Sequence, residues 1–289
     1  MRTPTSSILL SLVALGCSSG HGGGGFVAST APAATTPPPP PAPPATRAPA
    51  PVASSTPTAP PAPRLPVLVV VGLAQEAQIA QGPGVIVVMS DSDPAHLRAL
   101  LASFQASSVR AVVSFGIAGG LDVNTVPGTL MVANEVVATA GGQTWTPDPA
   151  LSAEIMARLQ AGNVPASFGL FAGSDTLSAD DTPAAKLATK QATGADEVDM
   201  ESHIAAAFAQ ANALPFAALR AVADPQSVGL PPAALLPIQS NGQPDILAIL
   251  GSVVTDPSQI PLLLQTYADS QASFTALQKA AAAVNMGGL

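Results

Sequence analysis

The chain has 289 residues, 31 of them proline, and only 10% of its residues are charged. These residues are unevenly distributed, because 15 prolines lie within residues 32–66 and all 18 acidic residues lie from Glu76 onward. Beyond residue 66, 7 basic and 18 acidic residues give a net charge of −11, which argues against binding to nucleic acid. The single cysteine, Cys17, excludes an internal disulfide framework and any multi-cysteine metal site.

The N-terminus has the pattern of an export signal. Arg2 precedes the apolar or small residues 8–16, which suit the core of a signal peptide and are too few to span a bilayer. The sequence Ala14-Leu15-Gly16-Cys17 resembles a bacterial lipobox. We therefore expect residues 1–17 to be a lipoprotein-type signal peptide with lipidation at Cys17. An ordinary signal peptide with an incidental cysteine is the alternative.

A linker follows this signal. Residues 18–65 consist mainly of Gly, Pro, Ala, Thr and Ser, and a segment of this composition cannot bury enough apolar surface to fold. Its proline-rich part favours an extended spacer of about 3 Å per residue. The sequence therefore predicts a disordered tether that holds a domain, residues 66–289, away from the membrane. The anchored protein is expected to face the periplasm or the cell surface.

Predicted strands and helices alternate along residues 66–289. Apolar runs rich in β-branched residues, at 68–72 and 84–89, are typical of strands buried on both faces. Asp93-Pro94 predicts a helix start, with the aspartate as cap and the proline in the first turn. Further strands are predicted at 111–115, 129–139, 167–172 and 216–222, and further helices at 149–161, 183–192, 201–213 and 257–284. This alternation predicts a three-layer α/β/α domain.

Two motifs combine a strand end with small residues. In Gly72-Leu-Ala-Gln-Glu76 a single carboxylate follows the first strand, and a solvated loop residue is the alternative interpretation. In Ser114-Phe-Gly-Ile-Ala-Gly-Gly120 the glycines allow the backbone to approach a ligand closely, and a tight turn is the alternative.

Two further motifs are acidic. Residues 196–203 contain four acids within six positions and lead into an alanine-rich helix, whose dipole favours some of these charges. In Leu219-Arg-Ala-Val-Ala-Asp224 an apolar strand runs into an acid, which suits a general acid, and a capping aspartate is the alternative. Together the four motifs predict three acids and a glycine turn at one edge of a sheet, where ligands bind in open α/β folds.

The order of these motifs, with Gly173-Ser174-Asp175 before the acidic cluster, resembles the purine nucleoside phosphorylase and methylthioadenosine nucleosidase superfamily. Val198-Asp-Met-Glu-Ser-His203 and residues 215–225 are most similar to its hopanoid-associated branch, which is associated with removal of adenine from adenosylhopane. The resemblance covers residues 66–289. It implies a nucleoside phosphorylase-like fold with a mixed central sheet.

The resemblance implies a role for each matching residue. Asp224 matches the acid at N7 of the purine, which makes the base a better leaving group. Glu201 matches the carboxylate that holds the ribose hydroxyls and steadies the positive charge of an oxocarbenium ion. Glu76 matches the acid near the nucleophilic water. The substrate-binding matches are Met200 on the sugar, Ala118 and Gly119 beside ribose and base, and Asp175, Thr176 and Leu177 along the purine.

The implied activity is cleavage of the N-glycosidic bond of an adenine nucleoside with a 5′ substituent. The nucleophile is water or inorganic phosphate, and the loop 72–81 contains no Arg or Lys to hold phosphate. Arg220 fits a structural ion-pair partner, and His203 is predicted to be a core residue. No metal-ligand spacing exists among His21, His96 and His203, and the family implies no cofactor and a homo-oligomer of two, three or six chains.

A second hypothesis has no catalysis. The superfamily acts mostly on cytoplasmic nucleosides, whereas residues 1–65 indicate export, so a surface lipoprotein that only binds a nucleoside or a partner is the alternative. A lipid-linked nucleoside as substrate reconciles the anchor with the enzyme.

Overall fold

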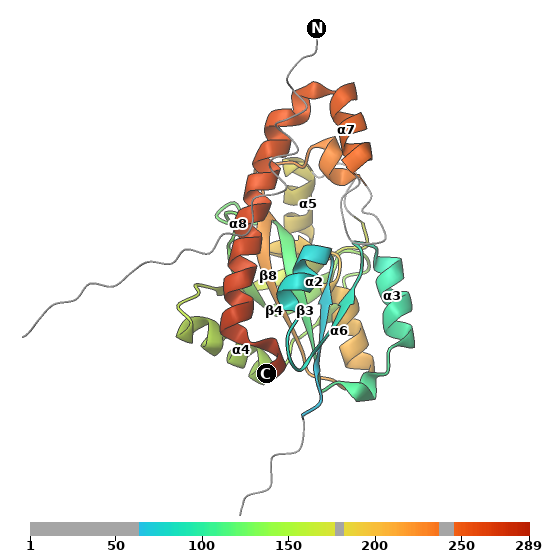
Figure 1. The fold of residues 1–289 in the computed structure, drawn as a ribbon, viewed down its shortest axis with the longest axis vertical. Coiled ribbons are helices and arrows are strands. Elements are labelled where there is room, and N and C mark those ends of the chain that lie inside the picture. Colours follow the sequence, from blue (N-terminus) through green and yellow to red (C-terminus); the bar gives the residue numbers. More distant parts are fainter. Residues whose placement is uncertain (1–63, 177–181, 237–245) are drawn as a thin grey trace, which may run out of the picture. The chain divides into compact units, whose positions relative to one another are not determined.

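The computed structural model describes residues 64–176, 182–236 and 246–289. The expected signal peptide, Cys17, the linker up to residue 63 and Leu177 lie outside the described residues. Eight strands form one sheet (Figure 1). They are β1 (Val67–Val71), β2 (Val85–Met89), β3 (Ala111–Gly120), β4 (Leu130–Ala138), β5 (Thr144–Trp145), β6 (Ser167–Gly173), β7 (Glu197–Asp199) and β8 (Phe216–Asp224).

The sheet contains two parallel groups of strands. Strands β1, β2, β3 and β8 pair in parallel, as do β4, β6 and β7. Antiparallel pairs join β8 to β4 and the end of β3 to β7. The pairings form a closed ring, β3-β8-β4-β6-β7, so part of the sheet curves back on itself. The expected mixed sheet is confirmed, and the ring is an additional feature.

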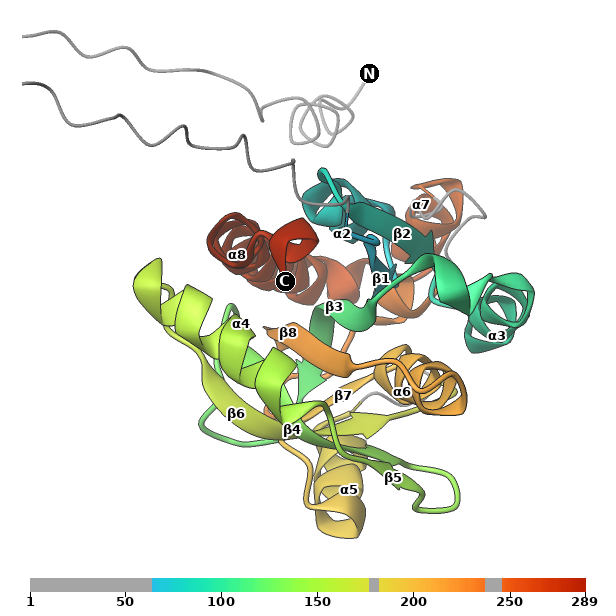
Figure 2. The ribbon, with the colours of Figure 1, turned by 90° about the horizontal axis from the view of Figure 1, so that it is seen from below.

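Helices lie on both faces of the sheet (Figure 2). They are α2 (Ala74–Ala80), α3 (Pro94–Ser103), α4 (Pro149–Ala161), α5 (Pro183–Thr193), α6 (Ser202–Ala211), α7 (Ile246–Thr255) and α8 (Ile260–Val284). Short 3₁₀ turns occur at Ala106–Ser108, Pro232–Leu235, Pro257–Gln259 and Met286–Gly288. Helices α2, α4 and α8 bury one face around Phe115 and Leu219. Helices α3 and α6 bury the other face around Phe171, which completes the predicted three layers.

Most predicted elements are confirmed. Asp93 caps α3, and its carboxylate accepts hydrogen bonds from the N–H groups of Ala95 and His96 at 2.8 and 3.1 Å. Two details differ from the predictions. Strand β3 continues to Gly120 instead of ending in a glycine turn, because its last two residues pair with β7. The acidic motif leads into a helix as predicted, with α6 beginning at Ser202, but it also contains the short strand β7 at Glu197–Asp199, which was not predicted.

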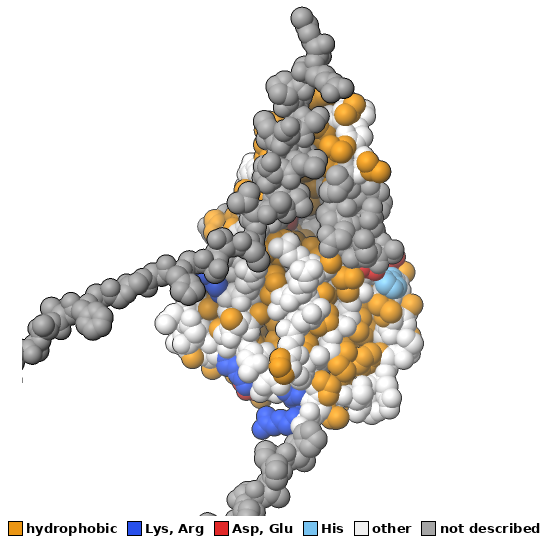
Figure 3. Space-filling view, viewed as in Figure 1, with side chains coloured by type: hydrophobic (Ala, Val, Ile, Leu, Met, Phe, Trp, Pro, Cys, Tyr) orange, Lys and Arg blue, Asp and Glu red, His pale blue; other side chains and the backbone are white. Residues whose placement is uncertain are grey.

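Helix α7 presents an apolar surface. Leu247 and Val254 are 82% and 80% exposed, and hydrophobic side chains are visible over this helix in the space-filling view (Figure 3). Within the described residues no single helix is long and apolar enough to cross a membrane. Leu247–Thr255 and Pro257–Gly288 meet that criterion only as a pair, which is bent by 109°.

Candidate active site

A cavity of about 370 Å³ lies at the carboxyl ends of β1, β3 and β8. The sequence-predicted residues that line it are Glu76, Ala118, Gly119, Thr176, Met200, Glu201 and Asp224. Asp175 borders a different cavity, described below. The residues that come together here are spread over almost 150 positions of sequence. The topology brings them together because parallel strands deliver their carboxyl ends to the same edge.

Glu76 lies in the first turn of α2 and is only 1% exposed. Its Oε2 accepts hydrogen bonds from the N–H groups of Gly72 and Leu73 at 2.7 and 2.9 Å, and its Oε1 accepts one from Ile117 at 2.7 Å. Burial, with the nearby Glu201 adding, raises the pKa of Glu76 to about 7, although Arg220 and the N–H groups of Ile117 and Leu73 act in the opposite direction. At neutral pH the group therefore exists in both protonation states, which suits a general base.

Glu201 is the central member of a buried ionic network. Arg220, fully buried on β8, directs Nη2 to Glu201 Oε2 at 3.2 Å and to Asp199 Oδ1 at 3.1 Å. Ser90 donates to Glu201 Oε1 at 2.8 Å. Burial raises the pKa of Glu201, and Arg220 opposes that shift. Arg220 thus acts as the expected ion-pair partner and holds one oxygen of Glu201 while the other meets Ser90.

Asp199 completes this network from the end of β7. Its Oδ1 accepts hydrogen bonds from the N–H groups of Glu201 and Ser202 at 2.7 and 2.6 Å, which fixes the turn into α6. Burial by itself lowers the pKa of Arg220, but the carboxylates of Asp199, Glu201 and Glu76 outweigh that effect and raise it. The guanidinium consequently stays charged beside three acids.

Asp224 ends β8 and has a partner that the sequence interpretation missed. Lys186 of α5 forms an ion pair with Asp224 Oδ2 and is only 2% exposed. Asp224 is also the register partner of Gly119 across a β-bulge between β3 and β8. A Cβ on Gly119 would stand 3.3 Å from Asp224 Oδ2, so glycine at this position leaves room for the carboxylate. The three residues form one corner of the cavity.

Asp175 has a different environment from the other predicted residues. It pairs with Arg98 of α3 at 2.7 Å and with His203 Nε2 of α6 at 2.8 Å. Partial burial opposes ionisation, but hydrogen bonds from Arg98 and His203 hold the pKa of Asp175 below its ordinary value. All three border a separate cavity of about 460 Å³. His203 is buried, as expected, and its contact with Asp175 joins the residue after β6 and Ser174 to α6.

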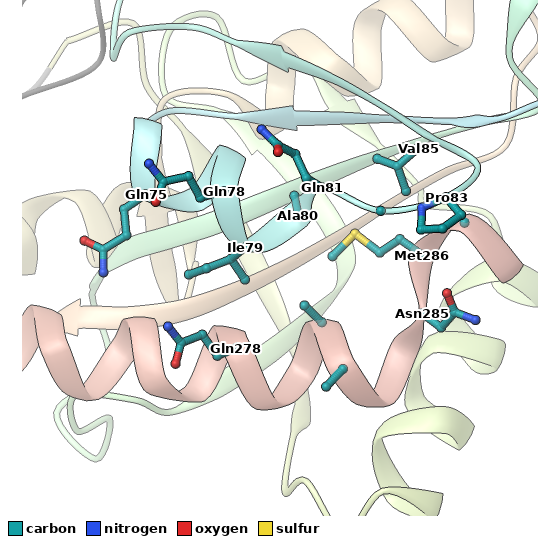
Figure 4. Close-up of a pocket in the computed structure, with 14 residues that line it drawn as sticks. Gln75, Gln78, Ile79, Ala80, Gln81, Pro83, Val85, Gln278, Asn285 and Met286 are labelled. Carbon is teal, nitrogen blue, oxygen red and sulfur yellow. The ribbon is translucent and has the colours of Figure 1, made fainter. Parts of the chain in front are cut away.

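A larger cavity, of about 670 Å³, lies between α2 and the C-terminal end of α8 (Figure 4). Its polar lining consists of amides such as Gln75, Gln78, Gln278 and Asn285, and the fourteen residues around it include no ionisable side chain. Volume alone favours this cavity, but catalysis of bond cleavage requires groups that carry charge or protons. The smaller acidic cavity is therefore the candidate active site. Among the described residues, no group of three or more His, Cys, Asp or Glu could hold a metal ion.

Among the solved structures that share the fold are two nucleosidases and a futalosine hydrolase. The 5′-methylthioadenosine/S-adenosylhomocysteine nucleosidase of Neisseria meningitidis, in complex with methylthio-immucillin-A, aligns with a TM-score of 0.56 at 14% identity over 77% of this chain and 99% of that one. The Helicobacter pylori nucleosidase of the same name, with butyl-thio-DADMe-Immucillin-A, aligns with a TM-score of 0.53 at 15% identity. The alignment covers 76% of this chain and 98% of that one. Futalosine hydrolase of Helicobacter pylori strain 26695 aligns with a TM-score of 0.51 at 15% identity. The alignment covers 74% of this chain and 97% of that one.

Curated protein sequences give no match. The sequence itself matches the phosphorylase superfamily over residues 78–234, which include β2 to β8 and most of the residues that line the acidic cavity. The expected nucleosidase or phosphorylase class agrees with that match. The chain belongs to the phosphorylase superfamily.

Proposed function

We propose that this protein hydrolyses the N-glycosidic bond of an adenine nucleoside. The observation that carries the proposal is the convergence of Glu76, Glu201 and Asp224 on one cavity from three separate regions of the chain. Glycosidic cleavage needs a group at the leaving base, a negative charge near the sugar and an activated nucleophile. The carboxyl groups of Asp224, Glu201 and Glu76 are available for these three tasks, because each has a different environment in the cavity.

Each carboxylate has one role in the proposal. As the C1′–N9 bond breaks, its electron pair moves to the purine, and the carboxyl group of Asp224, which has taken up a proton from solvent, gives that proton to N7. Glu201 binds the ribose hydroxyls and stabilises the positive charge that develops on the ring.

Met200 packs on the sugar, and Ala118 and Gly119 lie beside ribose and base. Thr176 contacts the purine, and Asp175 supports that segment from behind.

Water is the proposed nucleophile. Lys186 is the only cation among the described residues that line the cavity, and it is paired with Asp224 at the base end. Arg220 is held by Asp199 and Glu201. A phosphate ion usually needs a cation or several N–H groups that are not otherwise bonded. Glu76, with its pKa near 7, takes a proton from the attacking water as that water bonds to C1′.

The substrate carries a 5′ substituent in this proposal. Two of the similar enzymes are named for 5′-methylthioadenosine, an adenine nucleoside modified at that position. A lipid-linked nucleoside, as in the hopanoid-associated branch, fits an enzyme anchored through Cys17 on the exported side of a membrane. That location, the anchor and a homo-oligomer rest on the sequence and on the resemblance.

Release of free base tests the proposal. The soluble domain, residues 66–289, is incubated with adenosine, 5′-methylthioadenosine and a 5′-alkyl adenosine, with and without phosphate. The expected product is adenine together with the free sugar in both conditions. Sugar 1-phosphate in place of free sugar would make phosphate the nucleophile. Tight adenine binding with no release from any substrate would instead favour a binding lipoprotein.

A further inference from the structure

The bent pair of helices α7 and α8 exposes apolar side chains in two stripes. On each helix the exposed residues recur at spacings of three and four positions, which places them along one side of that helix. The stripe residues are Leu247, Leu250 and Val254 on α7 and Ile260, Leu264 and Tyr267 on α8. They make up six of the eleven large hydrophobic side chains that are exposed in the described part of the chain, so the apolar exposure is concentrated on this helix pair.

The sequence of this helix pair carries almost no charge. Asp256, in the bend between the helices, is the only charged residue from Ile246 to Ala268. The chain beyond residue 66 has 18 acidic and 7 basic residues, so an acidic domain contains one region that is both uncharged and apolar. Exposed apolar regions of this kind mark sites that contact another protein or a membrane.

Gln259 holds the two helices together and joins them to the rim of the candidate active site. It is buried at the bend, and its Nε2 donates a hydrogen bond to the backbone carbonyl of Ser252 on α7 at 3.0 Å. Its Oε1 accepts a hydrogen bond from the N–H of Ala233 at 2.9 Å. Ala233 belongs to the 3₁₀ turn that closely follows Leu230, and Leu230 lines the acidic cavity. The helix pair is therefore fixed beside the cavity.

The shape of the pair suits a position on a membrane and not across it. Its two segments meet the length and composition criterion for a membrane span only together, and the bend of 109° interrupts that span. The C-terminal half of α8 packs into the core of the domain through Phe274 and Leu277. Helices that expose an apolar side lie in the membrane interface with that side in lipid. Tyr267 adds an amphipathic ring, which is favoured at this depth.

Two observations favour lipid over a second copy of the chain. A stable protein interface takes about 20–30 residues from each partner, whereas the two stripes offer six side chains. The predicted anchor at Cys17 also brings the domain to a membrane. The start of β1 and helix α7 lie at opposite ends of the domain (Figure 1). The predicted linker, residues 18–65, reaches about 140 Å when extended, whereas a folded domain of this length has a radius of gyration of about 17 Å. The linker is therefore long enough for the α7 end to turn to the membrane.

We infer that the α7–α8 helix pair is a membrane-docking surface, which inserts its two stripes into the interface of an electrically neutral lipid bilayer. Insertion of apolar side chains drives the binding, because no Lys or Arg from Ile246 to Ala268 attracts anionic lipid. The docking itself does not depend on the proposed function. Together with that function, it turns the cavity rim at Leu230 towards lipid, where a nucleoside with a lipid 5′ substituent is found.

Flotation with lipid vesicles tests the inference in the absence of the lipid anchor. The domain of residues 66–289, which contains the whole sheet and both apolar clusters, is mixed with vesicles of phosphatidylcholine. A second set of vesicles contains equal parts of phosphatidylcholine and phosphatidylglycerol. The test variant is Val254→Asp with Leu264→Asp, at side chains that are 80% and 55% exposed. The control is Val123→Asp with Val126→Asp, which adds the same charge in the loop between β3 and β4, at side chains 74% and 62% exposed.

The wild type should bind the neutral vesicles equally well at low and high salt, because insertion of apolar groups is not screened by ions. It should bind the anionic vesicles no more tightly, since the domain is acidic. The test variant should have a partition coefficient at least about 10-fold lower, because full burial of one Val or Leu side chain contributes about that much. The control variant should bind as the wild type does.

Three results would overturn the inference. The first is a wild type that does not bind neutral vesicles, and the second is equal binding by the two double variants. The third is a wild type that forms a dimer in sedimentation, that does not bind vesicles and that the test variant converts to a monomer, which would assign the surface to a second copy.

Hydrogen exchange of the wild type decides if the test variant does not fold. Neutral vesicles should slow the exchange of backbone amides in residues 246–268 and leave residues 121–129 unchanged. Vesicles that slow no amide in residues 246–268 would overturn the inference. Release of adenine from 5′-methylthioadenosine is measured on the same wild-type sample. Release without vesicle binding would refute the docking alone, and vesicle binding without release from any nucleoside would refute the proposed function alone.

Discussion

Gly116 of β3 lies against the carboxylate of Glu76 so closely that a Cβ at this position would stand 2.5 Å from Glu76 Oε1. The same Cβ would stand 2.6 Å from Arg220 Nη1. The absence of a side chain at Gly116 therefore leaves room on one side of β3 for both the carboxylate of Glu76 and the guanidinium of Arg220. The sequence left a tight turn as the alternative interpretation of this motif, whereas in the fold Gly116 makes room for two charged groups.

Substitution of this glycine should disturb both groups. Gly116→Ala forces displacement of Glu76 or Arg220 in a fully packed region, and overpacking of this kind costs about 1–3 kcal/mol. We expect a lower melting temperature and a large loss of nucleoside cleavage. Gly82→Ala is the matched control, since a Cβ there meets no atom within 4 Å. Equal melting temperatures and activities for the two variants would contradict this account of Gly116.

The pH dependence of cleavage should report Glu76. A general base works only when ionised, and burial raises the pKa of Glu76 to about 7. The value of kcat/KM should therefore fall as the pH decreases through about 7, and Glu76→Gln should lose activity across the whole range. Glu154→Gln, at an exposed position on α4, should leave the profile unchanged. A flat wild-type profile between pH 5 and 8 would exclude Glu76 as the base.

Two arginine variants separate a buried ion pair from a surface one. Arg220→Met leaves Asp199 and Glu201 buried without their cation, and breaking such a network costs about 3–5 kcal/mol. Arg98→Met removes a pair whose side chains are 47% and 50% exposed, which is worth about 0–1 kcal/mol. Chemical denaturation measures both. Similar losses of unfolding free energy in the two variants would show that the Arg220 network is not a buried ionic core.

Glu197 should make the protein less stable as the pH rises. It is fully buried on β7, neither carboxyl oxygen has a hydrogen-bond partner among the described residues, and burial, with Asp199 adding, raises its pKa well above the ordinary value. Between the ordinary pKa and the raised one, the folded state binds a proton that the unfolded state has released. The free energy of unfolding therefore falls as the pH increases through this window, by about 1.4 kcal/mol per pH unit at most.

Glu197→Gln tests this effect because it cannot ionise. The variant should show a shallower decline of unfolding free energy with pH above the ordinary glutamate range, and it should match or exceed the wild type at pH 8. Denaturant titrations at several pH values provide the measurement. A decline as steep as that of the wild type would mean that another group causes it.

The sequence predicts the fold and part of the site for identifiable reasons. Apolar runs such as 68–72 and a capped start such as Asp93-Pro94 depend on local physics, so their elements appear where expected. The course of β3 past Phe115 does not, because it depends on pairing with β8 up to Gly119 and with β7 at Gly119-Gly120, and both partner strands are distant in sequence. Local patterns carry no record of such a partner.

The candidate site likewise contains residues that the sequence predicts and residues that only the tertiary fold reveals. Glu201 and Asp224 stand in motifs that resemble a known superfamily, and their cavity contains both. Lys186 stands in an alanine-rich helix with Lys190 four residues later, and both lysines look like solvated surface residues by sequence. Only the tertiary fold shows that the first is buried against Asp224 and that the second is 28% exposed beside Asp122 and Asp196.

The release of adenine from 5′-methylthioadenosine by the domain of residues 66–289, with wild type and Asp224→Ala side by side, tests the central claim most directly. The account predicts adenine and free sugar from the wild type without phosphate, and a rate about 10²- to 10⁴-fold lower for Asp224→Ala at a temperature at which circular dichroism shows both proteins folded. Release at the wild-type rate by Asp224→Ala would contradict it.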